Sequence, residues 1–182
     1  LCNPNNPTAT LHARDELLDA AQQLRRRGGW LVVDEAFLDA DPAHALVSLA
    51  GGEEAPNLIV LRSLGKFFGL AGARVGFVFG AADKLDRLRE ALGPWPLANP
   101  SRAVARAALE DAAWQAATRA ELYAGAQRLA ELLAPFGEVG RCALFCTLKS
   151  AQPALLFEHL ARHAILTRRF DQQAILRFGL PG

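Results

Sequence analysis

Methionine is absent from all 182 residues of this chain, and tyrosine occurs only once. The chain opens with Leu1-Cys2-Asn3-Pro4, so it has neither an initiator methionine nor the charged and apolar regions of a signal peptide. We therefore expect the natural start to lie upstream. The chain is then a fragment that lacks the N-terminal part of a longer protein.

Long apolar runs and an excess of one charge sign are also lacking. No run approaches the roughly 18 residues that are needed to cross a bilayer. The 20 basic and 19 acidic side chains give a net charge of +1, which argues against a protein that grips nucleic acid or anionic lipid. With 51% apolar and 21% charged residues, the composition is that of a globular protein and not of a disordered one. We expect no nucleic-acid partner and no membrane partner.

Cysteine is scarce as well. Cys2, Cys142 and Cys146 are too few, and odd in number, for a secreted disulfide framework, so we expect reduced thiols and a cytoplasmic protein. The apolar sequence around Cys142 and Cys146 predicts one buried strand, on which the two residues would lie about 13 Å apart. His159 and His163 have a spacing that can chelate a metal, but the sequence offers no evident third ligand, so we expect no metal site.

Strands alternate with helices in the first half of the chain. Short apolar runs at residues 30–33, 58–61 and 74–79 predict strands, and apolar periodicity predicts helices over residues 11–27 and 82–92. Acidic residues near the start of the first helix, arginines in its last turn and a glycine after it suit the helix dipole and a glycine stop. This order predicts a mostly parallel sheet with right-handed crossovers.

The second half predicts a long alanine-rich helix followed by a smaller α+β unit. The helix extends from about residue 101 to residue 133, and Asp111 is a point at which it can break. The elements predicted after it are strands over residues 143–148, 165–167 and 175–179 and a helix over residues 154–163. We therefore expect two domains, residues 1–110 and residues 111–182, with the connecting helix in the second.

Polar residues stand where two predicted strands end. Asp34 directly follows the first strand, and Ser63 lies at the end of the second; ligands of open α/β sheets bind beyond the carboxyl ends of strands. The glycine-rich loop after Ser63 contains Lys66, flanked by two phenylalanines, and closes with Arg74. A lysine in apolar surroundings can act as a nucleophilic amine, and Ser63 with Arg74 suits a phosphate. An aldehyde cofactor that bears a phosphate would use all three, whereas the alternative is an ordinary surface loop with a solvated lysine.

Four linked motifs add a more specific resemblance. In chain order they are Asn3-Pro4-Asn5-Asn6-Pro7-Thr8, Val33-Asp34-Glu35-Ala36-Phe37, Ser63-x-x-Lys66 with Arg74, and Leu176-Arg177-Phe178-Gly179. Their order and spacing resemble those of the pyridoxal-phosphate enzymes of the aspartate-aminotransferase fold, across the whole chain. The resemblance implies an α/β fold with part of a large, mostly parallel domain and a small C-terminal α+β domain. It also implies pyridoxal 5′-phosphate as the cofactor.

The resemblance further implies a role for each matched residue on the cofactor. Lys66 would bond to the cofactor aldehyde and later move protons as the catalytic acid or base. Asp34 would pair with the pyridine nitrogen and keep it protonated. Ser63 and Arg74 would hold the cofactor phosphate.

Four further residues are assigned by the same resemblance. Asn6 would donate a hydrogen bond to the phenolic oxygen of the cofactor, and Phe37 would lie where the aminotransferases usually place a tyrosine for that oxygen. Arg177 would hold the substrate carboxylate in a bidentate fork. Arg168, or its neighbour Arg169, would bind a phosphate of the substrate.

Within this superfamily the chain resembles two families, the histidinol-phosphate aminotransferases and the threonine-phosphate decarboxylases of cobalamin biosynthesis. Phe37 lacks the tyrosine hydroxyl, and residues 94–97, 164–170 and 176–182 look more like the cobalamin-pathway enzymes. The resemblance therefore favours decarboxylation of L-threonine O-3-phosphate to aminopropanol phosphate. Transamination of histidinol phosphate or a similar phosphorylated amine is the alternative, and an inactive fragment of such an enzyme is a second one. The implied partners are a small phosphorylated amino acid and a second copy of the protein in a homodimer.

Overall fold

The computed structural model of the protein describes residues 1–180, so Pro181 and Gly182, which end the segment 176–182 and the predicted second domain, lie outside the described residues. The chain forms two compact units. Unit 1 contains Leu1–Asn3 and His12–Trp114, and unit 2 contains Pro4–Leu11 and the chain from Gln115 onward. The predicted division into domains after residue 110 stays a prediction.

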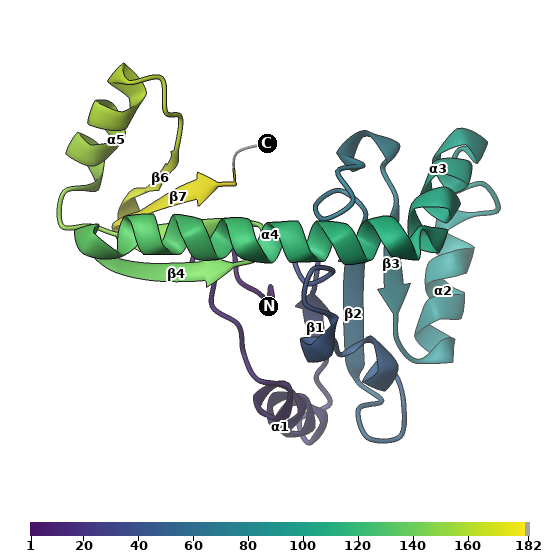
Figure 1. Ribbon diagram of the computed structural model, residues 1–182. Coiled ribbons are helices and arrows are strands. Elements are labelled where there is room, and N and C mark those ends of the chain that lie inside the picture. Colours follow the sequence, from purple (N-terminus) through teal and green to yellow (C-terminus); the bar gives the residue numbers. More distant parts are fainter. Residues whose placement is uncertain (181–182) are drawn as a thin grey trace. The chain divides into compact units, whose positions relative to one another are not determined.

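Unit 1 is built on a three-stranded sheet in the order β1-β2-β3, with the strands side by side in Figure 1. The strands are β1 (Leu31–Asp34), β2 (Leu58–Ser63) and β3 (Gly76–Phe79). β1 and β2 are parallel, as predicted, but β3 is antiparallel to β2, so the sheet is mixed. The reason is the connection: residues 64–75 contain only a short 3-10 helix, whereas a parallel return needs a longer crossover, usually through an α-helix.

The core of unit 1 lies on one face of β1 and β2. Alternate residues of both strands point into it, and α1 (Arg14–Arg25) covers it. The buried members of the cluster are Leu17, Ala21, Leu31, Val33, Leu46, Ala55, Leu58 and Val60. α1 has the predicted charge polarity, with Asp15 and Glu16 in its first turn and Arg25 in its last. Gly28, just beyond the helix, has a left-handed φ of 70°.

Asp111 breaks the predicted long helix. The structure has α2 (Ala82–Leu92), α3 (Asn99–Glu110) and α4 (Ala112–Leu133). The Asp111 carboxylate accepts a hydrogen bond of 2.9 Å from the Trp114 amide, which satisfies one of the free N–H groups in the first turn of α4. The interruption is therefore a helix start, confirming the prediction at this residue.

Unit 2 contains an antiparallel four-stranded sheet in the order β4-β5-β7-β6. Its elements are β4 (Glu138–Cys142), β5 (Phe145–Lys149), α5 (Pro153–Arg162), β6 (Arg168–Phe170) and β7 (Ile175–Gly179). Leu133 of α4 packs with β5 and β7 residues in the buried cluster, whose other members are Cys146, Leu148, Leu176 and Phe178. The short strand predicted at residues 165–167 lies three residues later, as β6.

The two neighbouring cysteines lie on different strands, so the prediction of one strand was wrong. Cys142 ends β4 and Cys146 lies in β5, and the strands form a hairpin in which Cys142 is opposite Phe145. β4 was missed because its sequence is polar and contains Gly140 instead of an apolar run. Neither residue forms a disulfide, and burial raises the pKa of the Cys146 thiol to about 11, so this thiol is a poor nucleophile at neutral pH.

The segment Pro4–Leu11 belongs to unit 2, and the unit 1 residues on either side of it, Asn3 and His12, are hydrogen-bonded to each other; these bonds are called the closed base of the segment. The fully buried Asn3 side chain accepts a hydrogen bond of 2.8 Å from the His12 amide and donates one of 3.3 Å to the His12 carbonyl. Within unit 2, a Cβ at Gly140 would lie only 2.7 Å from the Thr8 carbonyl oxygen, so the segment lies directly against β4. Only glycine permits this close approach.

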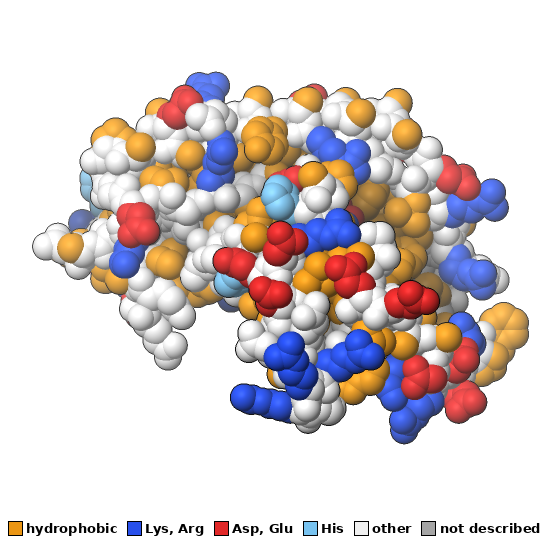
Figure 2. Space-filling view, turned by 90° about the horizontal axis from the view of Figure 1, so that it is seen from below, with side chains coloured by type: hydrophobic (Ala, Val, Ile, Leu, Met, Phe, Trp, Pro, Cys, Tyr) orange, Lys and Arg blue, Asp and Glu red, His pale blue; other side chains and the backbone are white. Residues whose placement is uncertain are grey.

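Charges of both signs are mixed on the face shown in Figure 2, where acidic, basic and apolar side chains intersperse. This distribution agrees with the near-zero net charge. Within residues 1–180, no helix is both long and apolar enough to cross a membrane.

The buried cluster of unit 1 predicts a large effect of truncating Leu58, which is only 1% exposed at the centre of the sheet. We expect Leu58→Ala to lower the free energy of unfolding by about 2–5 kcal/mol, because it removes apolar contacts and leaves a cavity. Leu88→Ala on α2, where the side chain is 37% exposed, is the matched control and should cost about 0.5 kcal/mol. Urea unfolding measures both, and equal losses would contradict the assigned core.

Candidate functional site

The predicted site residues divide between the two units, and each group is described in its own unit. Unit 1 holds five of them, at or after the ends of β1 and β2. Unit 2 holds three. In chain order the first group is Asp34, Phe37, Ser63, Lys66 and Arg74, and the second is Asn6, Arg168 and Arg177.

A cavity of about 290 Å³ brings three residues of the first group together. Ser63, Lys66 and Arg74 all line it, together with glycines and small apolar residues of the same loop. A hydroxyl, an amine and a guanidinium therefore share one open space in unit 1. Such a donor set suits a ligand that carries a phosphate and an electrophilic carbon.

The loop that forms this cavity is held by its own backbone. The Gly65 amide donates to Ser63 Oγ at 3.1 Å, and the Leu64 amide donates to the Val75 carbonyl at 3.2 Å. Arg74 has a left-handed φ of 55° at the end of the loop, and its Nη1 donates to the Ala71 carbonyl at 3.2 Å. The left-handed conformation is rare for a residue with a side chain, so the loop dictates where the guanidinium lies.

The surroundings of Lys66 differ from the prediction. The two phenylalanines that follow it turn into the protein and are buried, where they pack against each other and against Trp114 at ring-centroid distances of 5.0–5.9 Å. The Lys66 side chain remains exposed. Its Nζ lies 5.2 Å from the centre of the Phe37 ring, a cation–π arrangement. Phe37, and not Phe67 or Phe68, is therefore the aromatic ring that contacts the amine.

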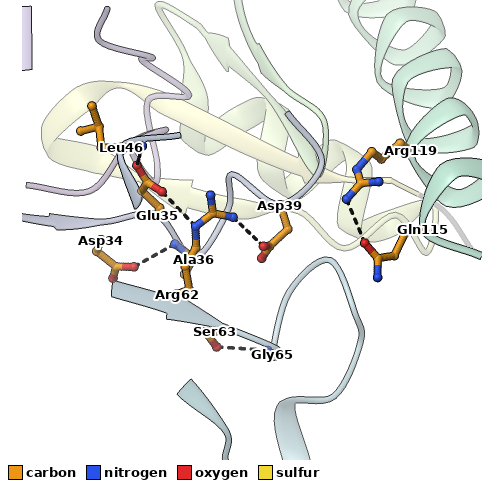
Figure 3. Close-up of polar contacts among 10 residues, drawn as sticks. All are labelled: Asp34, Glu35, Ala36, Asp39, Leu46, Arg62, Ser63, Gly65, Gln115 and Arg119. Carbon is orange, nitrogen blue, oxygen red and sulfur yellow. Dashed lines mark hydrogen bonds and ion pairs between the residues drawn. The ribbon is translucent and has the colours of Figure 1, made fainter. Parts of the chain in front are cut away.

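Asp34 is partly buried at the end of β1. Its Oδ1 accepts a hydrogen bond of 2.9 Å from the Ala36 amide, which fixes the carboxylate at the turn (Figure 3). On the backbone, the Asp34 amide donates to the Leu1 carbonyl at 2.8 Å, and the Asn3 amide donates to the Asp34 carbonyl at 2.9 Å. The first residues of the chain thus extend the sheet beside β1 and hold Asp34 in place.

A buried network beside Asp34 was missed by sequence reasoning. Glu35 is fully buried. Its Oε1 accepts a hydrogen bond of 2.7 Å from the Leu46 amide, and its Oε2 accepts one of 2.9 Å from Arg62 Nε. Arg62 Nη1 donates to Asp39 at 2.6 Å (Figure 3). The available signal was a pair of opposite charges, one at the end of each neighbouring apolar strand. Burial raises the pKa of the Glu35 carboxyl, although the Leu46 amide and the Arg62 guanidinium act to lower it.

The second group centres on Arg177 in β7. Its Nη1 donates to Asn6 Oδ1 at 2.6 Å, and its guanidinium carbon lies 5.3 Å from the centre of the Phe145 ring. Arg168 in β6 is its direct cross-strand partner. Burial, and secondly the charge of Arg168, lowers the pKa of Arg177. Two like charges placed opposite each other destabilise a sheet unless an anion lies between them, so this pair suits an anionic ligand.

Arg169 differs from Arg168 in its partner. Arg169 Nε pairs with Asp171 at 2.8 Å, so its charge is already compensated. Arg168 stacks on Phe170 at 5.2 Å. Of the two neighbours, Arg168 is therefore the better placed for an external anion. Within residues 1–180, no group of three or more His, Cys, Asp or Glu side chains is arranged to hold a metal ion.

The family described as "Aminotransferase class I and II" matches residues 1–173 of this chain. Over 181 residues the chain is 51% identical to a threonine-phosphate decarboxylase of Pseudomonas aeruginosa, covering 98% of this chain and 54% of that protein. Over 179 residues it is 45% identical to a histidinol-phosphate aminotransferase of Mycobacterium tuberculosis, covering 93% of this chain and 46% of that protein. The chain spans about half the length of the curated relatives it matches.

Solved structures agree on the fold. The chain is similar to a crystal structure of histidinol-phosphate aminotransferase from Sinorhizobium meliloti in complex with pyridoxal-5′-phosphate, with a TM-score of 0.81 and 25% identity. The match covers 99% of this chain and 51% of that one. The L-threonine-O-3-phosphate decarboxylase from Porphyromonas gingivalis matches with a TM-score of 0.77 at 20% identity, over 100% and 58% of the two chains. The predicted aminotransferase-like α/β fold is confirmed.

The raised pKa of Glu35 predicts a pH-dependent stability. A carboxyl whose pKa is higher in the folded state binds its proton more tightly there, so its contribution is complete below its ordinary pKa of 4.5 and is lost as the pH rises through the folded value. We expect the difference in unfolding free energy between the wild type and Glu35→Gln to fall as the pH rises from 4.5, by at most about 1.4 kcal/mol per pH unit. Urea unfolding at several pH values measures it, and a difference that grows with pH would contradict the assignment.

Proposed function

The chain belongs to the class I and II aminotransferase family, and from this premise we propose that the whole protein decarboxylates L-threonine O-3-phosphate to aminopropanol phosphate in cobalamin biosynthesis. The cofactor would be pyridoxal 5′-phosphate. The observation that carries the proposal is the shared cavity of Ser63, Lys66 and Arg74, in a chain that is 51% identical to a threonine-phosphate decarboxylase. The enzyme is a carboxy-lyase in this proposal and acts in the cytoplasm as a homodimer.

The residues of unit 1 fit this cofactor. Ser63 and Arg74 offer a hydroxyl and a cationic fork to a phosphate, and Lys66 offers the amine, from the walls of one cavity. Asp34 and Ser63 lie on the same face of the sheet, because each is one residue away from core-facing positions of its strand. Asp34 would therefore contact a cofactor ring that lies on this face of β1 and β2. Phe37 would contact the same ring next to Lys66.

When bound, pyridoxal phosphate supplies an aldehyde that takes up an amine and a cationic ring that withdraws electrons from the bond being broken. Lys66 Nζ would carry the aldehyde at rest and return a proton to the α-carbon of the substrate after carbon dioxide leaves. Asp34 would keep the proton on the ring nitrogen. The Ala36 amide holds the Asp34 carboxylate through one oxygen, and the second oxygen is available for the ring.

The residues of unit 2 would bind the substrate. Arg177 would hold the α-carboxylate, and Arg168, its cross-strand partner, the phosphate of threonine phosphate. Asn6 accepts a hydrogen bond from Arg177 through Oδ1, so its Nδ2 can donate to the phenolic oxygen of the cofactor. A substrate with two anionic groups would offset the repulsion between the two arginines.

Transamination of histidinol phosphate or a similar phosphorylated amine is the second candidate. It is supported by the 45% identity to the mycobacterial histidinol-phosphate aminotransferase. Against it stands Phe37, which offers a ring without a hydroxyl beside Lys66.

The cofactor assignment predicts that Lys66, one of the three lysines of this chain, is labelled. Borohydride reduction of the whole protein loaded with pyridoxal phosphate should fix the cofactor on Lys66, because only this lysine lines the cavity with a phosphate-type donor set. Peptide mapping identifies the residue. Lys66→Ala should lose the label, whereas the controls Lys84→Ala and Lys149→Ala should keep it. A label on either control lysine would contradict the assignment.

The two candidate reactions predict different products. Given threonine phosphate alone, the whole protein should release carbon dioxide and form aminopropanol phosphate without consuming a keto acid. Given histidinol phosphate with 2-oxoglutarate, it should form little glutamate. Carbon dioxide capture and a glutamate assay measure the two products. Stoichiometric glutamate without carbon dioxide would replace the decarboxylase by the aminotransferase.

A further inference from the structure

We propose that the ion pair between Glu35 and Arg62 is a positioning device that sets the spacing between Asp34 and Ser63, and so between the ring end and the phosphate end of the cofactor site. This inference rests on the proposed function. It assigns a role to two residues that touch neither cofactor nor substrate. The pair is called the Glu35–Arg62 pair below.

The Glu35–Arg62 pair lies directly behind the two residues that it would position. Glu35 follows Asp34 at the end of β1, and Arg62 precedes Ser63 at the end of β2. Because side chains alternate along a strand, Glu35 and Arg62 share the core face, and Asp34 and Ser63 share the opposite one. A link between the two strand ends on one face therefore sets the distance between the polar groups on the other.

The link is held by several hydrogen bonds because both Glu35 oxygens and two Arg62 nitrogens have partners. The Glu35 side chain is 0% exposed and the Arg62 side chain 13%, and they meet at 2.9 Å. The other Glu35 oxygen accepts from the Leu46 amide, and Arg62 also pairs with Asp39 at 2.6 Å. The Glu35 amide continues the strand ladder by donating to the Leu61 carbonyl at 2.9 Å. Such directional contacts fix both side chains in one arrangement.

Stability alone is a weak explanation for this pair. Buried ion pairs can often be replaced by well-packed apolar residues without loss of stability, although breaking one partner is costly. What an apolar pair lacks is a fixed hydrogen-bond direction. The two loops that start here carry Phe37 and Lys66, whose ring and amine meet at 5.2 Å. Because the pair lies where both loops begin, it can fix the position of one loop relative to the other.

The test compares two ligands of the apo form of the whole protein. Pyridoxal phosphate uses both ends of the site, whereas pyridoxal lacks the phosphate and uses only the ring end. We expect Glu35→Gln to raise the dissociation constant of pyridoxal phosphate by about 10- to 100-fold, by analogy with residues that orient the ligands of a metal ion. The dissociation constant of pyridoxal should change by less than about 3-fold, since one anchor needs no spacing. Absorbance titration gives both values.

Two further variants separate positioning from folding. Arg62→Lys keeps the charge but has no fork, so its dissociation constant for pyridoxal phosphate should fall between those of the wild type and Glu35→Gln. Glu110→Gln removes the same kind of Arg–Glu pair at an exposed position of α3, at 2.8 Å from Arg106, and should leave both ligands unaffected. Melting curves establish that each variant is folded at the titration temperature, and if Glu35→Gln is not folded, Arg62→Lys decides.

Each outcome is decisive. The proposal is supported if Glu35→Gln weakens the binding of pyridoxal phosphate but not of pyridoxal, and if Arg62→Lys weakens the binding of pyridoxal phosphate less. Equal losses for both ligands, or unchanged binding with a lower melting temperature, would show a structural role only and overturn it, while the proposed function would stand. A wild-type protein that binds neither ligand would overturn the proposed function, and this proposal with it.

Discussion

The parallel pairing of β1 with β2 is the constraint on which the chemistry of unit 1 depends. Parallel strands end at the same edge of the sheet, so Asp34 and Ser63 leave the sheet side by side although 29 positions separate them in the sequence. A one-residue slip in this register would move Asp34 to the core face and Glu35 to the open face. Both strands are apolar on both faces up to Val33 and Leu61, so the charged residues oppose that slip: it would bury Asp34 and break the contact of Glu35 with Arg62.

The arginines of the two units have different kinds of partner. In unit 1, the largely buried Arg62 side chain, which is 13% exposed, is compensated by two carboxylates. In unit 2, Arg168 and Arg177 face each other across two strands, and Arg177 donates to the uncharged Asn6 side chain. Arginine is thus paired with carboxylates in unit 1 and with an amide in unit 2, and only the proposed function gives the second arrangement an anionic ligand.

Much of the fold could be predicted from the sequence, because apolar patterns that extend over a whole helix or strand indicate the element that forms. The helix over Ala82–Leu92, the break at Asp111 and the strand β2 followed from apolar periodicity and turn residues. The direction of β3 could not be read, since the sequence shows a loop length and not the path of the loop. β4 was invisible because its polar residues and Gly140 fit a strand only once Pro4–Leu11 lies against it.

The candidate site divides in the same manner. Ser63, Lys66 and Arg74 stand in one short segment, so their shared cavity follows from local sequence. The contact of Lys66 with Phe37 and the burial of Glu35 by Arg62 depend on the register of two strands, and no local pattern contains that register. Sequence reasoning therefore found the polar groups that line the cavity and missed the buried Glu35 and its partner Arg62 beside them.

The closed base of the Pro4–Leu11 segment has a consequence for how such a protein can change over generations. The hydrogen bonds between Asn3 and His12 join the two ends of the segment, so the backbone beside β1 is held without help from the residues between them. Substitutions in the stretch that contains Asn6 are then limited by its packing against β4 and not by the position of Asp34.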